Sequence, residues 1–278
     1  MKKLDDDYKK PSYWVNAEER AGKAKEWVEF INTHLKKETE KAISNSMVIK
    51  EEDRLSTIME KKEGKVQVLP MTTVEAIMFA DRFSKENHIE RIAALNFASF
   101  TSPGGKFLEG SSAQEESLCH ASNLYPILKT FQKTFYDVNY KNKRNNGLYH
   151  SDMIYSEGVT FLSNDCRVNA DVITCAAPFT RTVLRYKRAT EEVCQEVMRS
   201  RIQRILQVAY AKGVDCLILG AFGCGVFGND PRFVARTFQE ELDRIGRDKF
   251  HWIIFAIPSL NDQDSTIKIF LEEIKDGL

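Results

Sequence analysis

Apolar residues occur along this chain in short continuous runs that alternate with longer stretches of helical spacing. The short runs end at glycine, proline or polar turn residues and predict strands at 65–69, 92–98, 159–162, 172–177, 215–221 and 252–257. Apolar positions three or four residues apart predict helices at 16–41, 72–87, 113–134, 191–212, from 231 onward, and at 266–275. Strands that alternate with helices in this way predict an α/β layer fold.

Polar and proline residues predict where several of these elements begin or break. Asn16 and Asp230 each precede a helical stretch as an N-cap residue, and Pro231 suits a first helical position. Pro126 predicts a break near Tyr125. The polar segments 1–15 and 136–150 are expected to form a loose arm and a surface loop.

A glycine-rich loop and a carboxylate triplet follow the strand at 92–98. The loop contains Pro103-Gly104-Gly105-Lys106, and Gln114-Glu115-Glu116 begins the next helical stretch. Two glycines let backbone amides approach an anionic ligand closely. Carboxylates just beyond such a loop can act on whatever the anion anchors, so the arrangement indicates an enzyme that acts on a phosphate-bearing sugar or nucleotide.

The triplet also has a purely structural interpretation. Ser112-Ala113-Gln114-Glu115 fits a capping box, and acidic residues in a first helical turn suit the helix dipole. Taken alone, the triplet favours capping. Capping accounts for Ser112 and Glu115, but it leaves Gln114 and Glu116 unexplained.

A second glycine-rich loop follows the strand at 215–221. It matches G-x-G-x-x-G, but only one further strand follows, at 252–257, and the acidic residue after that strand, Asp262, is too far along for a dinucleotide fold. A nicotinamide dehydrogenase is therefore disfavoured, whereas a phosphate-binding strand–loop–helix is indicated. The candidate ligand-binding residues of this loop are Gly223, Cys224, Gly225, Val226, Phe227, Gly228 and Asn229.

Together, the two motifs resemble the microbial-type poly(ADP-ribose) glycohydrolase family. The resemblance runs through Asn96-Phe97-Ala98, Pro103-Gly104-Gly105, Gln114-Glu115-Glu116 and the segment 220–229, in the order that the family shows. It implies a macrodomain-like fold, with three α/β/α layers around a mixed central sheet. It also implies an N-terminal accessory helical segment at 1–60, which extends a catalytic domain at 61–278.

The resemblance assigns roles to the candidate residues. The second glutamate of the triplet is catalytic in the family, which maps to Glu116, with Glu115 and Gln114 positioning the substrate. Asn96 is a candidate ribose contact, and the alternative is a turn hydrogen bond. Adjacent glutamates point about 100° apart on a helix, so one residue acting first as acid and then as base is favoured over an opposed pair.

In two places the sequence departs from the family pattern. Lys106 stands where the family has a third glycine, and Phe179 follows Ala177-Pro178 where the family often has asparagine. Lysine does not adopt positive φ cheaply, so we expect Lys106 either to reshape the loop or to place an ammonium near the diphosphate. Two alternatives to the cleavage of polymer therefore stay open: removal of single ADP-ribose units from protein or nucleic acid, and binding of ADP-ribose without cleavage.

Composition narrows the class of partner. Lysine plus arginine and aspartate plus glutamate each number 40, so the formal net charge is zero and no global positive field attracts nucleic acid. The densest basic stretch, at 181–188, is interpreted as a solvated loop, with the flank of an anionic polymer site as the alternative. We expect ADP-ribose or poly(ADP-ribose) on modified proteins as the partner, no sequence-specific nucleic-acid binding, and a monomer.

Six cysteines form no C-x-x-C pair, which favours reduced thiols in a cytoplasmic protein. Cys119 and His120 are adjacent, and they are interpreted as structural. No spacing of cysteine and histidine suggests a metal site, and no cofactor is expected. No run of apolar residues is long enough to span a membrane, so no membrane partner is expected.

Overall fold

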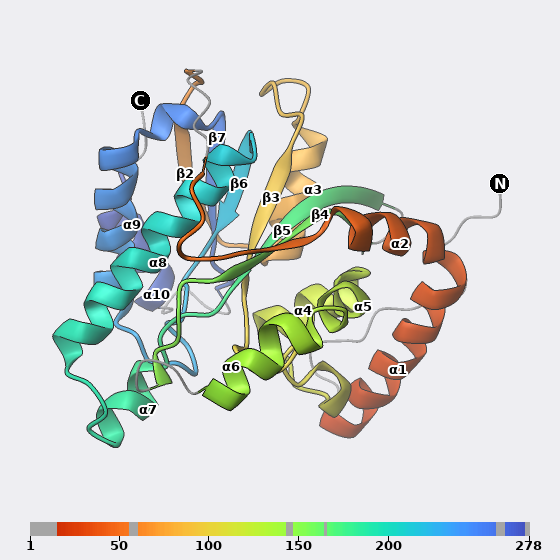
Figure 1. Cartoon of the computed structure of the whole chain (residues 1–278). Helices are drawn as coiled ribbons and strands as arrows, with labels where there is room; N and C mark the ends of the chain where they lie inside the picture. The colour runs from red at the N-terminus through yellow and green to blue at the C-terminus, as the bar shows by residue number, and fades with distance from the viewer. Residues whose placement is uncertain (1–15, 56–60, 143–146, 164–165, 260–264, 276–278) are drawn as a thin grey trace.

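The computed structural model describes residues 16–55, 61–142, 147–163, 166–259 and 265–275 (Figure 1). The segment 1–15, predicted to be a loose arm, lies outside these residues. The strands are β1 (Met47–Ile49), β2 (Lys65–Leu69), β3 (Ile92–Phe97), β4 (Met153–Ser163), β5 (Cys166–Cys175), β6 (Cys216–Leu219) and β7 (Trp252–Ala256). The α-helices are α1 (Ala17–His34), α2 (Lys36–Asn45), α3 (Thr73–Arg82), α4 (Gln114–Ala121), α5 (Leu124–Lys129), α6 (Asp137–Asn142), α7 (Thr180–Arg185), α8 (Glu191–Ala211), α9 (Pro231–Ile245) and α10 (Ser265–Glu273).

The strands form one mixed sheet in the order β1-β4-β5-β3-β6-β7-β2. β5, β3, β6, β7 and β2 pair in parallel, whereas β4 is antiparallel to both of its neighbours. Because β3 and β6 are parallel neighbours, their carboxyl ends meet at one edge of the sheet. The two glycine-rich loops therefore leave the sheet side by side, which is where ligands of open α/β sheets bind.

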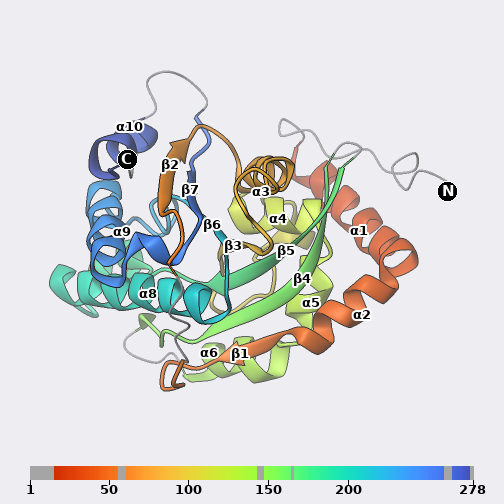
Figure 2. The same cartoon turned by 90° about the horizontal axis from the view of Figure 1, so that it is seen from above.

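Helices cover both faces of the sheet (Figure 2). Ile92 and Ala94 of β3 belong to a core shared with α1 to α5, whereas Ala93 and Leu95 belong to a core shared with α8 to α10. This alternation follows from the two-residue period of a strand whose faces are both buried. The predicted three-layer arrangement with a mixed sheet is confirmed.

The N-terminal helices pack on the sheet through apolar side chains. Asn16 caps α1 as predicted, accepting a hydrogen bond from Glu19 N at 2.8 Å. The predicted helix at 16–41 is divided at Leu35, which has φ −118° and ψ 19°. α2 leads into β1, an edge strand on β4 that the sequence did not predict. A division between an accessory segment at 1–60 and a catalytic domain at 61–278 stays a prediction.

Two other element predictions were wrong in position. The break in the stretch 113–134 lies at Ser122, whose backbone is extended and forms a β-bridge with Phe161. Pro126 instead lies in the first turn of α5. Backbone N–H groups in a first turn have no helical acceptor, so the N–H that proline lacks costs no helical hydrogen bond. The supposed surface loop at 136–150 begins with the fully buried Tyr136 and then forms α6.

Candidate active site

A cleft of about 660 Å³ lies where β3, α4 and the second glycine-rich loop meet. Phe97 at the end of β3 and Gln114 at the start of α4 line one side, and Gly223, Gly225 and Phe227 of the second loop line another. The N-terminus of α3 completes another wall, where Thr72 and Glu75 form a capping box. Glu115 and Glu116 adjoin the cleft without lining it, and their exposures are 3% and 5%.

Gln114 fixes α4 to the end of β3. Its side-chain oxygen accepts a hydrogen bond from Phe97 N at 2.8 Å, and its Nε2 donates to Leu95 O at 2.8 Å and to Thr73 Oγ1 at 3.1 Å. The side-chain amide of Gln114 thus makes the hydrogen bonds with the β3 backbone that a neighbouring strand would otherwise make. These bonds set the position of the two glutamates that follow.

Glu115 is a buried carboxyl rather than a cap. The N-cap position of α4 is Ala113, and no side chain caps this helix, so the capping prediction for Ser112 and Glu115 was wrong. Instead, Glu115 accepts hydrogen bonds from Ser99 N at 2.8 Å and Asn96 Nδ2 at 3.2 Å. Asn96 also donates to Thr174 Oγ1, so its amide nitrogen holds the carboxyl in place.

Burial is the main cause that raises the pKa of Glu115 to about 8. The neighbouring charge of Glu116 adds to this, whereas the hydrogen bonds from Ser99 and Asn96 oppose it. Glu115 therefore retains its proton near neutral pH, so the site holds a carboxylic acid of the kind that acid–base catalysis uses.

Glu116 has one carboxyl oxygen held and one free. Oε1 accepts a hydrogen bond from Lys106 N at 2.9 Å. Oε2 is buried and has no hydrogen-bond partner among the described residues. Since buried polar atoms are normally paired, the unpartnered Oε2 marks the atom that is available to a substrate.

Only glycine fits the bend of the first loop over the carboxyls. Gly104 and Gly105 have φ values of 69° and 59°. A Cβ atom on Gly105 would lie 2.5 Å from Glu116 Oε1 and 3.1 Å from Glu115 Oε2, and one on Gly104 would lie 2.8 Å from the Tyr125 ring. The two glycines thus let the backbone rest directly on the acidic pair.

Lys106 does not need the conformation of a glycine. Its φ is −110°, and its contact with Glu116 uses the backbone N–H that any residue except proline supplies. Its side chain is 71% exposed, and its ammonium lies 3.6 Å from Glu109. The departure from the family pattern therefore leaves the backbone contact with Glu116 in place, and the ammonium pairs with Glu109.

The second loop presents backbone donors to the cleft. The N–H groups of Gly225, Val226 and Phe227 make no hydrogen bond with another described residue, whereas those of Cys224, Gly228 and Asn229 do. Consecutive backbone N–H groups without a protein partner are the kind of donor that anion-binding loops use. Burial raises the pKa of the Cys224 thiol to about 12, so this cysteine stays protonated and is no nucleophile.

Asn229 ties the second loop to the segment that follows β5. Its Oδ1 accepts from Thr180 Oγ1 at 2.6 Å, and its Nδ2 donates to Pro178 O and Gly223 O. Gly223 and Gly228 have φ values of 73° and 74°, and a Cβ on Gly223 would meet Ala177 at 2.4 Å. Asn229 thus stabilises the conformation of the second loop.

Phe227 joins the two loops. Its ring stacks on Phe179 with 4.8 Å between centroids, and it packs against Ala98, Phe100 and Ala176. Phe179, where the family often has asparagine, therefore supports the second loop.

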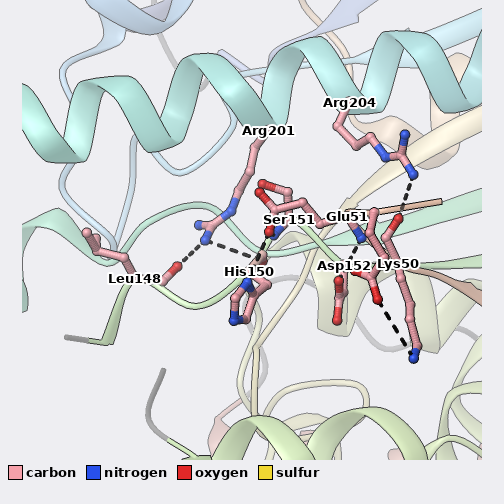
Figure 3. A network of polar contacts seen from close by, with 9 residues as sticks. Lys50, Glu51, Leu148, His150, Ser151, Asp152, Arg201 and Arg204 are labelled. Carbon is pink, nitrogen blue, oxygen red and sulfur yellow. Dashed lines mark hydrogen bonds and ion pairs between the residues drawn. The ribbon is translucent and has the colours of Figure 1, made fainter. Parts of the chain in front are cut away.

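A buried arginine that the sequence did not single out supports the first loop from behind. Arg201 of α8 is fully buried, and its guanidinium lies 4.7 Å from the centroid of Phe100, which also stacks on Tyr149 at 4.1 Å. Figure 3 shows Arg201 pointing toward the carbonyls of Leu148 and His150. Burial lowers its pKa to about 10, so it stays charged at neutral pH.

His120 also lines the cleft, whereas its neighbour Cys119 is buried in the core. The histidine ring packs edge-on against Phe107 at 4.6 Å. Burial, and then the charge of Arg20, lower the pKa of His120 to about 4, so it is neutral at physiological pH. Neither ring nitrogen has a hydrogen-bond partner in the described part of the chain.

In the ranges that the structure describes, no three histidine, cysteine, aspartate or glutamate side chains gather as metal ligands. Within the same ranges, no helix has the length and apolar character needed to cross a bilayer.

Comparison with known families gives a match over residues 23–164, just over half of the chain, to the family described as microbial-type PARG, catalytic domain. The chain belongs to this family. Microbial-type PARG proteins are poly(ADP-ribose) glycohydrolases, as the solved structures below are named, and they share the macrodomain-like fold described above.

Solved PARG structures align along most of this chain. The poly(ADP-ribose) glycohydrolase of Thermomonospora curvata is 26% identical with a TM-score of 0.79, covering 92% of this chain and 100% of its own. The same protein bound to the inhibitor ADP-HPD gives 28% identity and a TM-score of 0.77, covering 92% of this chain and 99% of its own. The enzyme of Deinococcus radiodurans in complex with ADP-ribose is 31% identical with a TM-score of 0.73, covering 84% of this chain and 96% of its own. A search of curated proteins found no match.

Proposed function

We propose that this chain hydrolyses the ribose–ribose O-glycosidic bonds of poly(ADP-ribose) and releases ADP-ribose. The observation that carries the proposal is the free, buried Oε2 of Glu116, held beside the glycine loop at the edge of a cleft. The second loop lines that cleft with three consecutive backbone N–H groups that have no partner among the described residues. The carboxyl is suited to proton transfer and the N–H groups to a diphosphate, and membership of the PARG family supports the combination.

The substrate's diphosphate binds the N–H groups of Gly225, Val226 and Phe227. Backbone donors of this kind suit phosphate oxygens because they need no reorganisation on binding. The cleft volume of about 660 Å³ suits a ligand of nucleotide size. With the diphosphate fixed there, the terminal ribose lies over Gly104 and Gly105, next to Glu116.

Glu116 then acts first as acid and afterwards as base. Its carboxyl donates a proton to the oxygen that leaves C1 of the terminal ribose, and the C–O bond breaks through an oxocarbenium-like state. A water attacks C1 and returns a proton to the Glu116 carboxylate, which restores the enzyme. Glu115, held by Asn96 and Ser99, positions ribose hydroxyls.

The sequence left two alternative functions open, removal of single ADP-ribose units and binding without cleavage, because Lys106 departs from the family pattern. The geometry of Lys106 gives these alternatives little support. Its side chain is paired with Glu109, and its φ is ordinary. The buried acidic pair favours cleavage over simple binding, because a buried carboxyl with a raised pKa beside a second carboxyl is typical of active sites. Modified proteins as carriers of the polymer, a monomeric state and a cytoplasmic location stay predictions.

The test compares two defined substrates. Wild-type protein is incubated with purified poly(ADP-ribose) and with a peptide that carries a single ADP-ribose unit, and the released ADP-ribose is quantified by chromatography. Glu116→Gln, which keeps the size of the side chain and removes its acid, is the control. We expect release from the polymer by the wild type alone. Release from the peptide only would assign the second function, and release from neither would leave the binding function.

A further inference from the structure

A basic and aromatic surface adjoins the second glycine loop. It consists of α7 and the turn after it, and we call it the arginine–tyrosine patch; its members are Arg181, Arg185, Tyr186, Lys187 and Arg188, all exposed. From Ala176 to Thr190 the sequence contains these four cations and no carboxylate, in a chain whose net charge is zero. Positive charge is therefore concentrated here.

The cations of the patch are not neutralised by ion pairs. No carboxylate in the described ranges lies within 4 Å of Arg181, Arg185, Lys187 or Arg188. Some exposed arginines elsewhere do have carboxylate partners, as Arg236 has in Glu273 and Arg244 has in Glu241. Because guanidinium groups bind phosphate oxygens bidentately, an unpaired cluster of them is suited to a polyphosphate ligand.

Tyr186 gives the patch a flat aromatic face. Its ring is 61% exposed, and the guanidiniums of Arg185 and Arg188 lie 5.8 Å and 5.3 Å from its centroid. An exposed ring flanked by cations matches the surfaces that bind single-stranded nucleotides, where a base stacks on the ring and phosphates meet the cations.

The patch is connected to the cleft through the second loop. Arg181 N donates to Phe227 O at 3.0 Å, and a Cβ on Gly228 would lie 3.2 Å from Arg181 Nε. At the other end, Arg188 Nη1 lies 3.6 Å from the Cβ position of Gly147, beside the segment that holds Tyr149 against Phe100. Figure 1 shows α7 at the same end of the molecule as α4 and α6. The patch therefore extends from the diphosphate loop toward the loop over the glutamates.

We propose that the arginine–tyrosine patch binds the nucleotide unit of poly(ADP-ribose) next to the one held in the cleft. The cleft accommodates one ADP-ribose unit, so the adjoining unit lies on the surface beside it. Its adenine stacks on Tyr186, and its diphosphate pairs with Arg185 and Arg188. This inference rests on the proposed function and deepens it, since it makes the polymer, rather than a single adduct, the substrate that the surface favours.

The experiment removes the patch without touching the cleft. In the triple variant Arg185→Ala/Tyr186→Ala/Arg188→Ala, kcat/KM is measured for length-fractionated poly(ADP-ribose) and for an α-O-glycoside of ADP-ribose with a chromogenic phenol. The glycoside offers the same bond to the same glutamates but lacks a neighbouring nucleotide. Arg236→Ala, an exposed arginine of α9, is the matched control, and melting temperatures check that each variant is folded.

We expect the ratio of polymer to glycoside kcat/KM to fall about tenfold or more in the triple variant and to stay unchanged in the control. The salt dependence of polymer turnover should also weaken, since fewer phosphates are neutralised. An unchanged ratio, or an equal fall for both substrates, would overturn the assignment of the patch and leave the proposed function standing.

A binding measurement separates the two proposals if turnover is absent. Polymer affinity is measured by fluorescence anisotropy in the Glu116→Gln background, with and without the triple substitution, beside ADP-ribose and a single-stranded DNA oligonucleotide. Loss of polymer affinity with ADP-ribose affinity retained supports the patch even if the wild type cleaves nothing. Equal polymer affinity, or DNA bound as tightly as polymer, contradicts it.

Discussion

Gly105→Ala tests whether the loop over the glutamates is a catalytic device. Gly105 has φ 59°, and an added Cβ would lie 2.5 Å from Glu116 Oε1. Ordinary contact begins at 3.4 Å, so the carboxyl would have to move by 3.4 − 2.5 = 0.9 Å. The substitution thus displaces the proposed acid without removing it.

Two effects of different size follow. An alanine in the left-handed region costs about 1–2 kcal/mol of stability, or roughly 2–8 °C in melting temperature. A displacement of about 1 Å at a reacting group costs about 10²-fold in rate. We therefore expect kcat on poly(ADP-ribose) to fall about a hundredfold in a protein that is fully folded at the assay temperature.

Gly213→Ala is the matched control. Gly213 has φ 70°, and a Cβ there would meet nothing within 4 Å. The control carries the same backbone strain, so both variants should lose similar stability in calorimetry, while only Gly105→Ala loses turnover. If Gly105→Ala retained wild-type kcat, or if both variants lost it equally, the glycine would have no specific bearing on Glu116.

Three further predictions concern the same site. The folded-state pKa of Glu115 is raised to about 8, so the contribution of Glu115 to the free energy of unfolding is full below the unfolded pKa of about 4.3 and declines as pH rises toward 8. The melting temperature should therefore fall less between pH 6 and 8 in Glu115→Gln than in the wild type. Lys106→Ala should change kcat/KM less than about fivefold, because the exposed pair with Glu109 contributes at most about 1 kcal/mol; a larger loss would place its ammonium on the substrate. Activity should persist in excess chelator, and a loss that zinc or magnesium restores would show a metal requirement.

Much of the fold was predictable because it depends on local patterns. The spacing of apolar residues and the length of each segment predicted the buried strand at 92–97 and the long helix at 191–211. The residue type of Asp230 predicted the N-cap of α9. β1 and α6 were not predicted, because β1 is too short for a pattern and the residues of α6 are polar. Their conformation depends on pairing with β4 and on the burial of Tyr136.

The candidate site was predictable in its motifs but not in its contacts. Glu115 fits a capping box as well as a catalytic pair, and local spacing cannot separate them. Tertiary contacts distinguish the two interpretations. Asn96 of β3 and the N–H group of Ser99 in the following loop donate hydrogen bonds to the Glu115 carboxyl. Arg201 gave no signal beyond a charged residue in an amphipathic helix, because its partner Phe100 is distant in sequence.

Single-turnover hydrolysis of poly(ADP-ribose) by the wild type, Glu116→Gln and Glu115→Gln tests the central claim most directly, with ADP-ribose affinity measured by calorimetry on the same samples. We predict that Glu116→Gln loses about 10²- to 10⁴-fold in rate while its ADP-ribose affinity stays within about tenfold, because the N–H groups proposed to bind the diphosphate belong to the second loop, and the acid belongs to α4. Near-wild-type hydrolysis by Glu116→Gln would remove Glu116 from the chemistry and contradict the mechanism.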